Sequence, residues 1–255
     1  MIEFFPVKVV KQKENFPLVE CILRSLKRNK ITLRHRDVLA ISSKFVALSE
    51  GRIVRLADVK PGKRARKLAK ENKMPPELVE LILKESDAVL CGVYGFLLAV
   101  KDNMIAPNAG IDKSNIYPGY AVLYPKDPFA SAEKLRKDLL RKTGKKLGIV
   151  LTDSRLMPTR IGTTGVAVAC AGFEPVDNCI GRKDLFGNVL KFTKRALADD
   201  IASGAELLMG EADESIPVVV IRPKKAAWRC TERKIKKNEM RMDWKKDIYI
   251  LGLSR

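Results

Sequence analysis

Apolar and polar residues alternate along this chain in two different patterns. Five short runs of mainly apolar residues have the length and composition of buried strands, and they lie at 38–42, 120–124, 147–152, 165–171 and 216–221. Between these runs, apolar side chains recur every three or four residues, as they do on one face of a helix. Because strands and helices do not follow a regular βα order, the pattern predicts a mixed α/β (α+β) protein.

Three of the helical segments also carry end signals. Pro76 opens one of them, since proline is favoured in the first turn of a helix. Ser131 is predicted to cap a second helix, which Gly144 ends. A third pattern runs from about residue 190 and stops at Gly210. We therefore expect helices in each of these three segments.

The charge of the chain is high and unevenly distributed. Its 255 residues include 49 Lys and Arg against 30 Asp and Glu, a formal net charge of +19. Such a charge suits nucleic acid, an acidic membrane surface or a small polyanionic substrate. Because Lys and Arg crowd the stretch 224–246, we predict one domain at 1–222 and a basic C-terminal extension at 223–255.

Two readings of the basic extension stay open. Trp228 and Trp244 lie among its cations, so the segment 224–246 has the residue types that bind nucleic-acid phosphates and stack on bases. The alternative is a solvated extension whose tryptophans pack on the body of the protein, because Lys-rich surfaces are common. No base-reading motif is present to favour the first reading.

The chain has neither a long apolar run nor the pattern of a signal peptide. No apolar run reaches the roughly 18 residues of a membrane-spanning helix, and the start lacks a basic leader with a small-residue cleavage site. We therefore expect a cytoplasmic protein without a membrane partner. Its five cysteines form no C-x-x-C pair, and His35 is its single histidine. A bound metal would accordingly use oxygen donors, which suits Mg or Mn.

Three acidic residues stand at positions suited to metal and phosphate chemistry. Asp112 lies in a turn-rich polar stretch before a strand, Asp153 ends the strand 147–152, and Glu211 follows the helical segment that stops at Gly210. Together they could hold one or two Mg or Mn ions that bridge the phosphates of a nucleotide. Each one alone is more typical of a turn cap or a solvated loop. The standard nucleotide motifs G-x-x-x-x-G-K-[ST] and G-x-G-x-x-G are absent.

Longer motifs favour the metal site over the turn-cap and loop alternatives. The chain contains NAGIDKSN at 108–115, LTD at 151–153, IGRKDLFG at 180–187 and LLMGE at 207–211. They occur in the same order and spacing as in the archaeal coenzyme F-420-0:γ-glutamyl ligases, which the chain resembles over roughly residues 36–222. Several long matches in register are far more specific than one short motif.

The resemblance implies a fold and an activity. It implies an α/β homodimer with an unusual topology, and a ligase that adds L-glutamate to the carboxylate of the coenzyme F-420 precursor. GTP is the implied second substrate, and two Mn or Mg ions are the implied cofactors. The implied route passes through an acyl phosphate, because a carboxylate is a poor electrophile until it is phosphorylated.

The resemblance also implies the roles of individual residues. Metal binding is implied for Asp112, Asp153, Ser154 and Glu211. Nucleotide contacts are implied for Phe16, Pro17, Leu18, Val19, Ser42, Ser43, Asn115, Met209, Gly210, Glu211, Ala212 and Asp213. We predict Asp153 and Arg160 as catalytic residues, Arg160 as one of three candidates for holding an anionic substrate, together with Arg182 and Lys183. Surface or interface ion pairs are an equal alternative for these three cations.

The chain departs from the family pattern at three places. Leu48 stands where the family has a nucleotide-contacting Lys, and Lys44 is the candidate to compensate. Residues 154–158 replace a Gly-containing loop with a stiffer one, and an apparent insertion includes residues 8–14. These departures fit a divergent member of the family as well as a paralogue that acts on another anionic carboxylate. GTP and ATP both remain open as the nucleotide.

Overall fold

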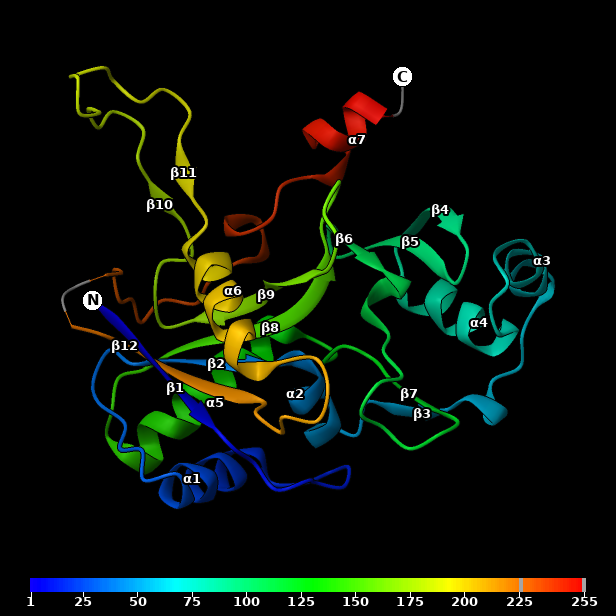
Figure 1. The fold of residues 1–255 in the computed structure, drawn as a ribbon, viewed down its shortest axis with the longest axis horizontal. Helices are drawn as coiled ribbons and strands as arrows, with labels where there is room; N and C mark the ends of the chain where they lie inside the picture. The colour runs from blue at the N-terminus through cyan, green and yellow to red at the C-terminus, as the bar shows by residue number, and fades with distance from the viewer. Residues whose placement is uncertain (225–226, 254–255) are drawn as a thin grey trace.

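A five-stranded sheet lies at the centre of the protein. The computed structural model describes residues 1–224 and 227–253, so Lys225 of the predicted basic extension lies outside the described residues. The strand order of the sheet is β1-β12-β2-β8-β9 (Figure 1). Strands β2 and β8 pair in parallel, whereas the other neighbours are antiparallel. The five strands are β1 (Ile2–Val7), β12 (Val218–Pro223), β2 (Val38–Ser42), β8 (Gly148–Leu156) and β9 (Thr163–Ala171).

Helices cover both faces of this sheet. Residues 38–41 of β2 are all fully buried, and because successive residues of a strand face opposite sides, neither face is open to solvent. Gly165 of β9 allows a close helix approach, since a Cβ there would lie 2.4 Å from the carbonyl oxygen of Ala202. The packing helices are α1 (Leu18–Arg28) against α5 (Pro128–Thr143), α5 and α6 (Leu197–Met209) against β8 and β9, and α2 (Ser43–Ser49) directly after β2.

A second, smaller lobe has its own hydrophobic cluster. It lies on the right in Figure 1 and joins the sheet through the start of β3 and the end of β7. Its helices are α3 (Lys63–Asn72) and α4 (Pro76–Glu85), with short 3-10 turns at η1 (Leu56–Asp58) and η2 (Asn108–Gly110). Its strands are β3 (Ile53–Arg55) paired with β7 (Tyr120–Val122), and the meander β4 (Ala88–Val93), β5 (Phe96–Lys101) and β6 (Met104–Pro107).

An arm projects from the main body between β9 and α6 (Figure 1). Its base is the two-stranded pair of β10 (Asp177–Asn178) and β11 (Lys194–Arg195). Apolar side chains further along it are open to solvent, since Leu185 is 100% exposed, Phe186 91% and Phe192 88%. Isolated apolar residues on a surface are ordinary, whereas several large ones on one projecting arm are unusual.

The segment after residue 226 packs onto the main core. Trp228 is 6% exposed, and its ring centroid lies 6.4 Å from that of the fully buried Phe173. Ile235 is buried in the same cluster, and Met240 packs against it. Short helical turns follow at η3 (Lys237–Glu239), η4 (Trp244–Lys246) and α7 (Ile248–Leu253). A domain boundary at residue 222 stays a prediction, but residues beyond it complete the core of the residues before it.

The mixed α/β architecture predicted from the pattern is confirmed. Pro76 begins α4, and Gly144 and Gly210 follow the last residues of α5 and α6 as predicted. The prediction of Ser131 as a helix cap is wrong, because α5 begins at Pro128. Asp127 caps this helix by accepting hydrogen bonds of 3.1 Å from the next two free backbone N–H groups. Across the described stretches, no helix is long and apolar enough to cross a bilayer.

Candidate active site

A pocket of about 690 Å³ opens at the edge of the sheet where the parallel strands end. The parallel pairing of β2 with β8 ends at Ser42 and Thr152, which brings Ser42 and Asp153 to one place. The prediction that Asp153 ends a strand is wrong, because β8 continues to Leu156 through its antiparallel pairing with β9. Segments distant in the sequence complete the walls, namely 9–12, 112–117 and 209–217. Most residues predicted to bind metal or nucleotide therefore line one pocket: Ser42, Asp112, Asn115, Asp153, Ser154, Met209, Gly210, Glu211, Ala212 and Asp213.

Asp153 is held through one of its two carboxylate oxygens. The hydroxyl of Tyr124 donates to Oδ2, and Nε of Arg155 donates to the same oxygen at 3.4 Å. Arg155 also donates through Nη2 to the Tyr124 hydroxyl at 2.7 Å. Burial raises the pKa of Asp153 above its ordinary value, although Arg155 and Tyr124 both favour the ionised form. Its other oxygen, Oδ1, accepts no hydrogen bond from any residue that the structure describes.

Asp112 has both of its carboxylate oxygens engaged. Ser114 donates to Oδ1 from its backbone N–H at 2.7 Å and to Oδ2 from its hydroxyl at 2.8 Å. The ammonium of Lys44 forms an ion pair with Oδ2. Burial alone would raise the pKa of Asp112, but Lys44 and Ser114 outweigh it and lower this pKa below its ordinary value.

Glu211 resembles Asp153 in having one engaged oxygen. The hydroxyls of Ser154 and Thr163 both donate to Oε1. Oε2 has no hydrogen-bond partner within the described part of the chain. The loop after Glu211 is fixed from across the pocket, because Nδ2 of Asn115 donates to the carbonyl of Ala212 at 2.7 Å.

The turn that carries Asp112 has a backbone that few residues adopt. Ala109 and Gly110 have positive φ angles of 54° and 72°, in the left-handed region. A Cβ on Gly110 would lie 2.1 Å from the ring of Tyr124. Glycine is therefore required both for the turn and for the ring that reaches Asp153.

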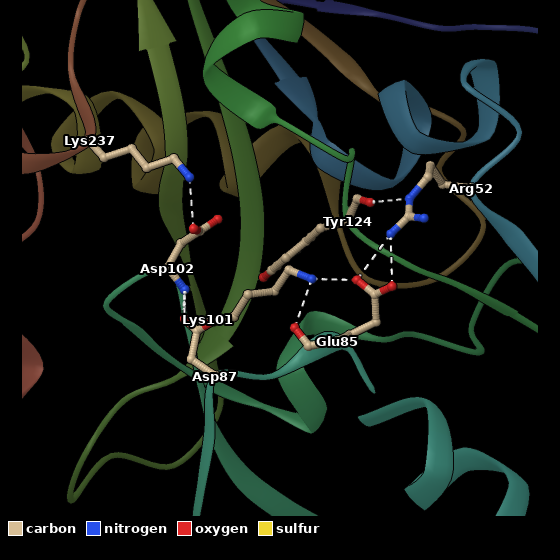
Figure 2. Close-up of polar contacts among 7 residues, drawn as sticks. All are labelled: Arg52, Glu85, Asp87, Lys101, Asp102, Tyr124 and Lys237. Atoms are coloured by element: carbon tan, nitrogen blue, oxygen red, sulfur yellow. Dashed lines mark hydrogen bonds and ion pairs between the residues drawn. The ribbon is translucent and has the colours of Figure 1, made fainter. Parts of the chain in front are cut away.

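A polar network joins the smaller lobe to Tyr124 (Figure 2). Glu85, at the end of α4, accepts hydrogen bonds of 3.0 Å from Nη2 of Arg52 on both of its oxygens, and it pairs with Lys101 of β5. Arg52 in turn donates through Nε to the backbone carbonyl of Tyr124 at 3.0 Å. Burial would raise the pKa of Glu85, but Lys101 and Arg52 together lower it, so this carboxylate is ionised.

The segment after residue 226 reaches the same region of the smaller lobe. Lys237 forms an ion pair of 2.7 Å with Asp102, as Figure 2 shows, and Arg241 donates to the backbone carbonyl of Asp102 at 3.0 Å. Lys237 and Arg241 lie in the segment for which nucleic-acid binding was predicted, but in the structure both bond to Asp102 of the protein itself. Arg233 likewise pairs with Glu174 and Glu239. Nucleic-acid binding through 224–246 stays a prediction.

Several predicted residues lie away from the pocket. Phe16 packs against Phe45 with ring centroids 4.9 Å apart. Pro17 precedes α1 and Leu18 and Val19 begin it, and none of the three lines the pocket. Ser43 is buried just beside it, next to Lys44. Arg160 lies exposed in the loop between β8 and β9, and Arg182 pairs with Asp177 at the base of the arm. Lys183 lies further along the same arm, where it bridges to Val189.

Residues outside the sequence prediction complete the site. Tyr124 and Arg155 hold Asp153, and Thr163 holds Glu211. Glu206 of α6 lines the pocket too, and burial together with the charges of Glu211 and Asp153 raises its pKa to about 7. A signal for Glu206 existed in the sequence, since it lies one helical turn before Gly210.

The oxygen donors of the pocket are of the type that a hard divalent ion prefers. Within residues 1–224 and 227–253, no three Asp, Glu, His or Cys side chains lie close enough together to enclose a metal. Asp153 and Glu211 each have one oxygen without a hydrogen bond from the described residues, whereas Asp112 forms an ion pair with Lys44. Mg is typically held by one or two carboxylates and completes its shell with water and substrate phosphates. The residues present therefore suit Mg or Mn.

Fold and site define the chain as an α/β protein with an acidic, oxygen-rich pocket at the end of its parallel strands. The model of the F420-0:Gamma-glutamyl ligase family matches residues 6–223, and the chain belongs to this family. It is 39% identical over 216 residues to the coenzyme F420:L-glutamate ligase of Methanosarcina mazei, covering 85% of this chain and 82% of that one. It is 38% identical over 240 residues to the same enzyme of Archaeoglobus fulgidus, covering 93% and 94%. The family resemblance seen in the motifs is thereby confirmed.

Proposed function

We propose that this protein is a cytoplasmic ligase that forms a γ-glutamyl amide bond between L-glutamate and the carboxylate of the coenzyme F-420 precursor. GTP and divalent Mn or Mg would be required, and the precursor carboxylate would be activated as an acyl phosphate. Family membership supports the ligase activity, because the relatives are named coenzyme F420:L-glutamate ligases. The charge of the pocket supports the requirement for metal.

The charge of the pocket is opposite to the charge of the chain. Two ammonium groups, those of Lys11 and Lys44, line the pocket together with six acidic side chains, those of Asp112, Asp153, Glu206, Glu211, Asp213 and Glu214. Even with Glu206 protonated, the acids outnumber the ammonium groups. A nucleotide triphosphate would be repelled by this surface without added positive charge. Divalent ions supply that charge, and this is the observation that carries the proposal.

The residues around the pocket have distinct tasks in this reaction. Metal ions bound through Oδ1 of Asp153 and Oε2 of Glu211 would neutralise charge on the transferred phosphoryl group. Tyr124 and Arg155 hold Asp153 through Oδ2 and leave Oδ1 without a hydrogen bond, and Ser154 and Thr163 hold Glu211 through Oε1 and leave Oε2 without one among the described residues. Preorganised groups of this kind need no rearrangement during the reaction.

Lys44 has a further task in the same proposal. Its ammonium forms an ion pair with Oδ2 of Asp112. When substrate binds, the ammonium of Lys44 would leave Asp112 for a phosphate, and Asp112 would then be available as a metal ligand. The predicted metal role of Asp112 thus depends on the displacement of Lys44.

We also propose that the protein acts as a homodimer. The arm between β10 and β11 leaves Leu185, Phe186 and Phe192 almost fully exposed. Large exposed apolar side chains clustered on one element are typical of a protein interface. A second copy of the chain would cover them.

Mass spectrometry of the reaction products tests the proposed activity. The protein is incubated with the glutamate-free coenzyme precursor, L-glutamate, GTP and Mn, and the product is weighed. We expect a product heavier by one or more glutamyl residues, and ATP in place of GTP establishes the nucleotide. An unchanged precursor, with metal-dependent nucleotide binding intact, would assign the chain to a paralogue with another anionic carboxylic acid as its acceptor.

The variant Asp153→Asn tests the metal site. We expect it to lose metal-dependent nucleotide turnover while its circular dichroism and unfolding midpoint stay close to those of the unchanged protein. Asp200→Asn is the matched control, since Asp200 is an exposed residue of α6 outside the pocket. Equal turnover in the two variants would refute the role of Asp153.

A further inference from the structure

The segment between β1 and α1 forms one wall of the pocket. Four of its residues, Val9, Val10, Lys11 and Gln12, line the pocket. Val9 fixes one end of the segment to the loop after α6, because its backbone N–H donates to the carbonyl of Ser215 at 2.9 Å and its own carbonyl accepts from the Ser215 hydroxyl at 2.8 Å. The segment is therefore tied to the loop that contains Glu211.

The far end of the segment is fixed to α2. The backbone N–H of Asn15 donates to the carbonyl of Leu48 at 3.0 Å, and the Asn15 side chain lies where a Cβ on Gly51 would be. Between the two ends, the side chain of Gln12 donates to the carbonyl of Val10 at 2.6 Å, so this hydrogen bond spans Lys11. The position of Lys11 over the pocket is thus set from both sides.

The two lysines that line the pocket differ in the contacts that their ammonium groups make. Lys44 is paired with Asp112 and donates to the hydroxyl and the carbonyl of Ser114 at 2.8 and 3.1 Å. Lys11 lies 5.3 Å from the ring centroid of Tyr117 and forms no ion pair with any residue that the structure describes. Its contact with an exposed ring is a weak one that an anion displaces readily. Lys11 is therefore the cation of the pocket that is free to bind an incoming anion.

We propose that Lys11 binds the phosphates of the nucleotide, and that the ring of Tyr117 supports its ammonium until the nucleotide arrives. This inference rests on the proposed function. Phosphate is favoured over a substrate carboxylate because Val9 ties the segment to the loop expected to surround the nucleotide. An ammonium with three donors also suits the several oxygens of a triphosphate.

Calorimetric titration of GTP in the presence of Mn tests the role of Lys11. We expect Lys11→Ala to weaken GTP binding by about 10-fold to 100-fold, which is typical for the loss of one charge-assisted hydrogen bond. Lys11→Arg should keep most of the affinity. The dissociation constant of Lys11→Ala should also rise less steeply with salt concentration, because one ionic contact is missing.

Lys13→Ala is the matched control, since Lys13 is exposed on the same segment but does not line the pocket. A rescue variant adds Leu48→Lys to Lys11→Ala, because Leu48 lines the same pocket and its carbonyl binds the segment. We expect the control to bind GTP normally and the rescue variant to regain part of the lost affinity.

The outcomes separate this inference from the proposed function. If the unchanged protein binds GTP with Mn and Lys11→Ala binds it within twofold, the role of Lys11 is refuted while the proposed function stands. If the KM for glutamate or the precursor rises and GTP affinity does not change, Lys11 binds a carboxylate and the phosphate assignment is wrong. If the unchanged protein binds neither GTP nor ATP with Mn, the proposed function and this inference both fail.

Discussion

Trp228 offers a direct test of whether the segment after residue 226 belongs to the core. Its side chain is 6% exposed and packs against Phe173, which is fully buried. Burying an aromatic side chain removes about 200 Å² from water, and at about 25 cal/mol per Å² this stabilises the fold by about 5 kcal/mol. Measured Trp→Ala substitutions in cores cost about 3–5 kcal/mol. We therefore expect Trp228→Ala to lower the free energy of unfolding by about 3–5 kcal/mol.

Urea unfolding followed by circular dichroism measures this loss, and thermal unfolding should show a midpoint lower by roughly 6–20 °C for a chain of this length. Trp244→Ala is the matched control, because Trp244 is partly exposed and its ring contacts Lys245 at the surface. We expect the control to cost less than about 1 kcal/mol. Equal, small losses in both variants would refute the reasoning and make 223–255 an appendage.

Two further predictions concern the pocket. Tyr124→Phe should weaken Mn binding by about 10-fold to 100-fold, since an outer-sphere donor to Asp153 is lost, whereas Tyr120→Phe, at the start of the preceding strand β7, should not. Titration of Mn followed by electron paramagnetic resonance measures this, and equal affinities would contradict it. The pKa of Glu206 is raised to about 7 in the folded protein from 4.5, so the folded state binds this proton more tightly than the unfolded chain. Its contribution to stability is thus present below about pH 4.5 and lost as the pH rises through 7. In metal-free buffer, Glu206→Gln should show a smaller fall in unfolding midpoint between about pH 5 and pH 7.5, and an unchanged fall would exclude Glu206 as its source.

Short, strongly apolar strands were the most predictable part of the fold. The run 38–42 coincides with β2, because a strand buried on both faces has little freedom in composition. Helix starts were harder to predict. Asp127 and Pro128 together form a better start signal than Ser131, since proline is favoured in the first helical turn. The third helix begins at Leu197 and not near 190, because the apolar residues before it belong to the exposed arm.

The acids of the site were predictable from their motifs, but their partners were not. Tyr124 lies 29 residues from Asp153 in the sequence, and only the fold brings its hydroxyl to Oδ2. The direction of Lys44 could not be predicted either, since it depends on how α2 faces the turn that contains Asp112. The raised pKa of Glu206 arises from burial beside two other carboxylates, which no local pattern reveals.

The pairing of β1 with β12 has a consequence for how the protein forms in the cell. Ile2 of the edge strand β1 pairs with Pro223 of β12, which the ribosome adds more than two hundred residues later. During synthesis, β1 therefore has no strand to pair with until β12 has been made. Trp228 and Ile235, which close the same core, emerge later still. Contacts between residues so distant in the chain slow folding. The nascent chain therefore holds an unpaired strand and an open core through most of its translation, and chaperones that bind such surfaces would protect it until the sheet closes.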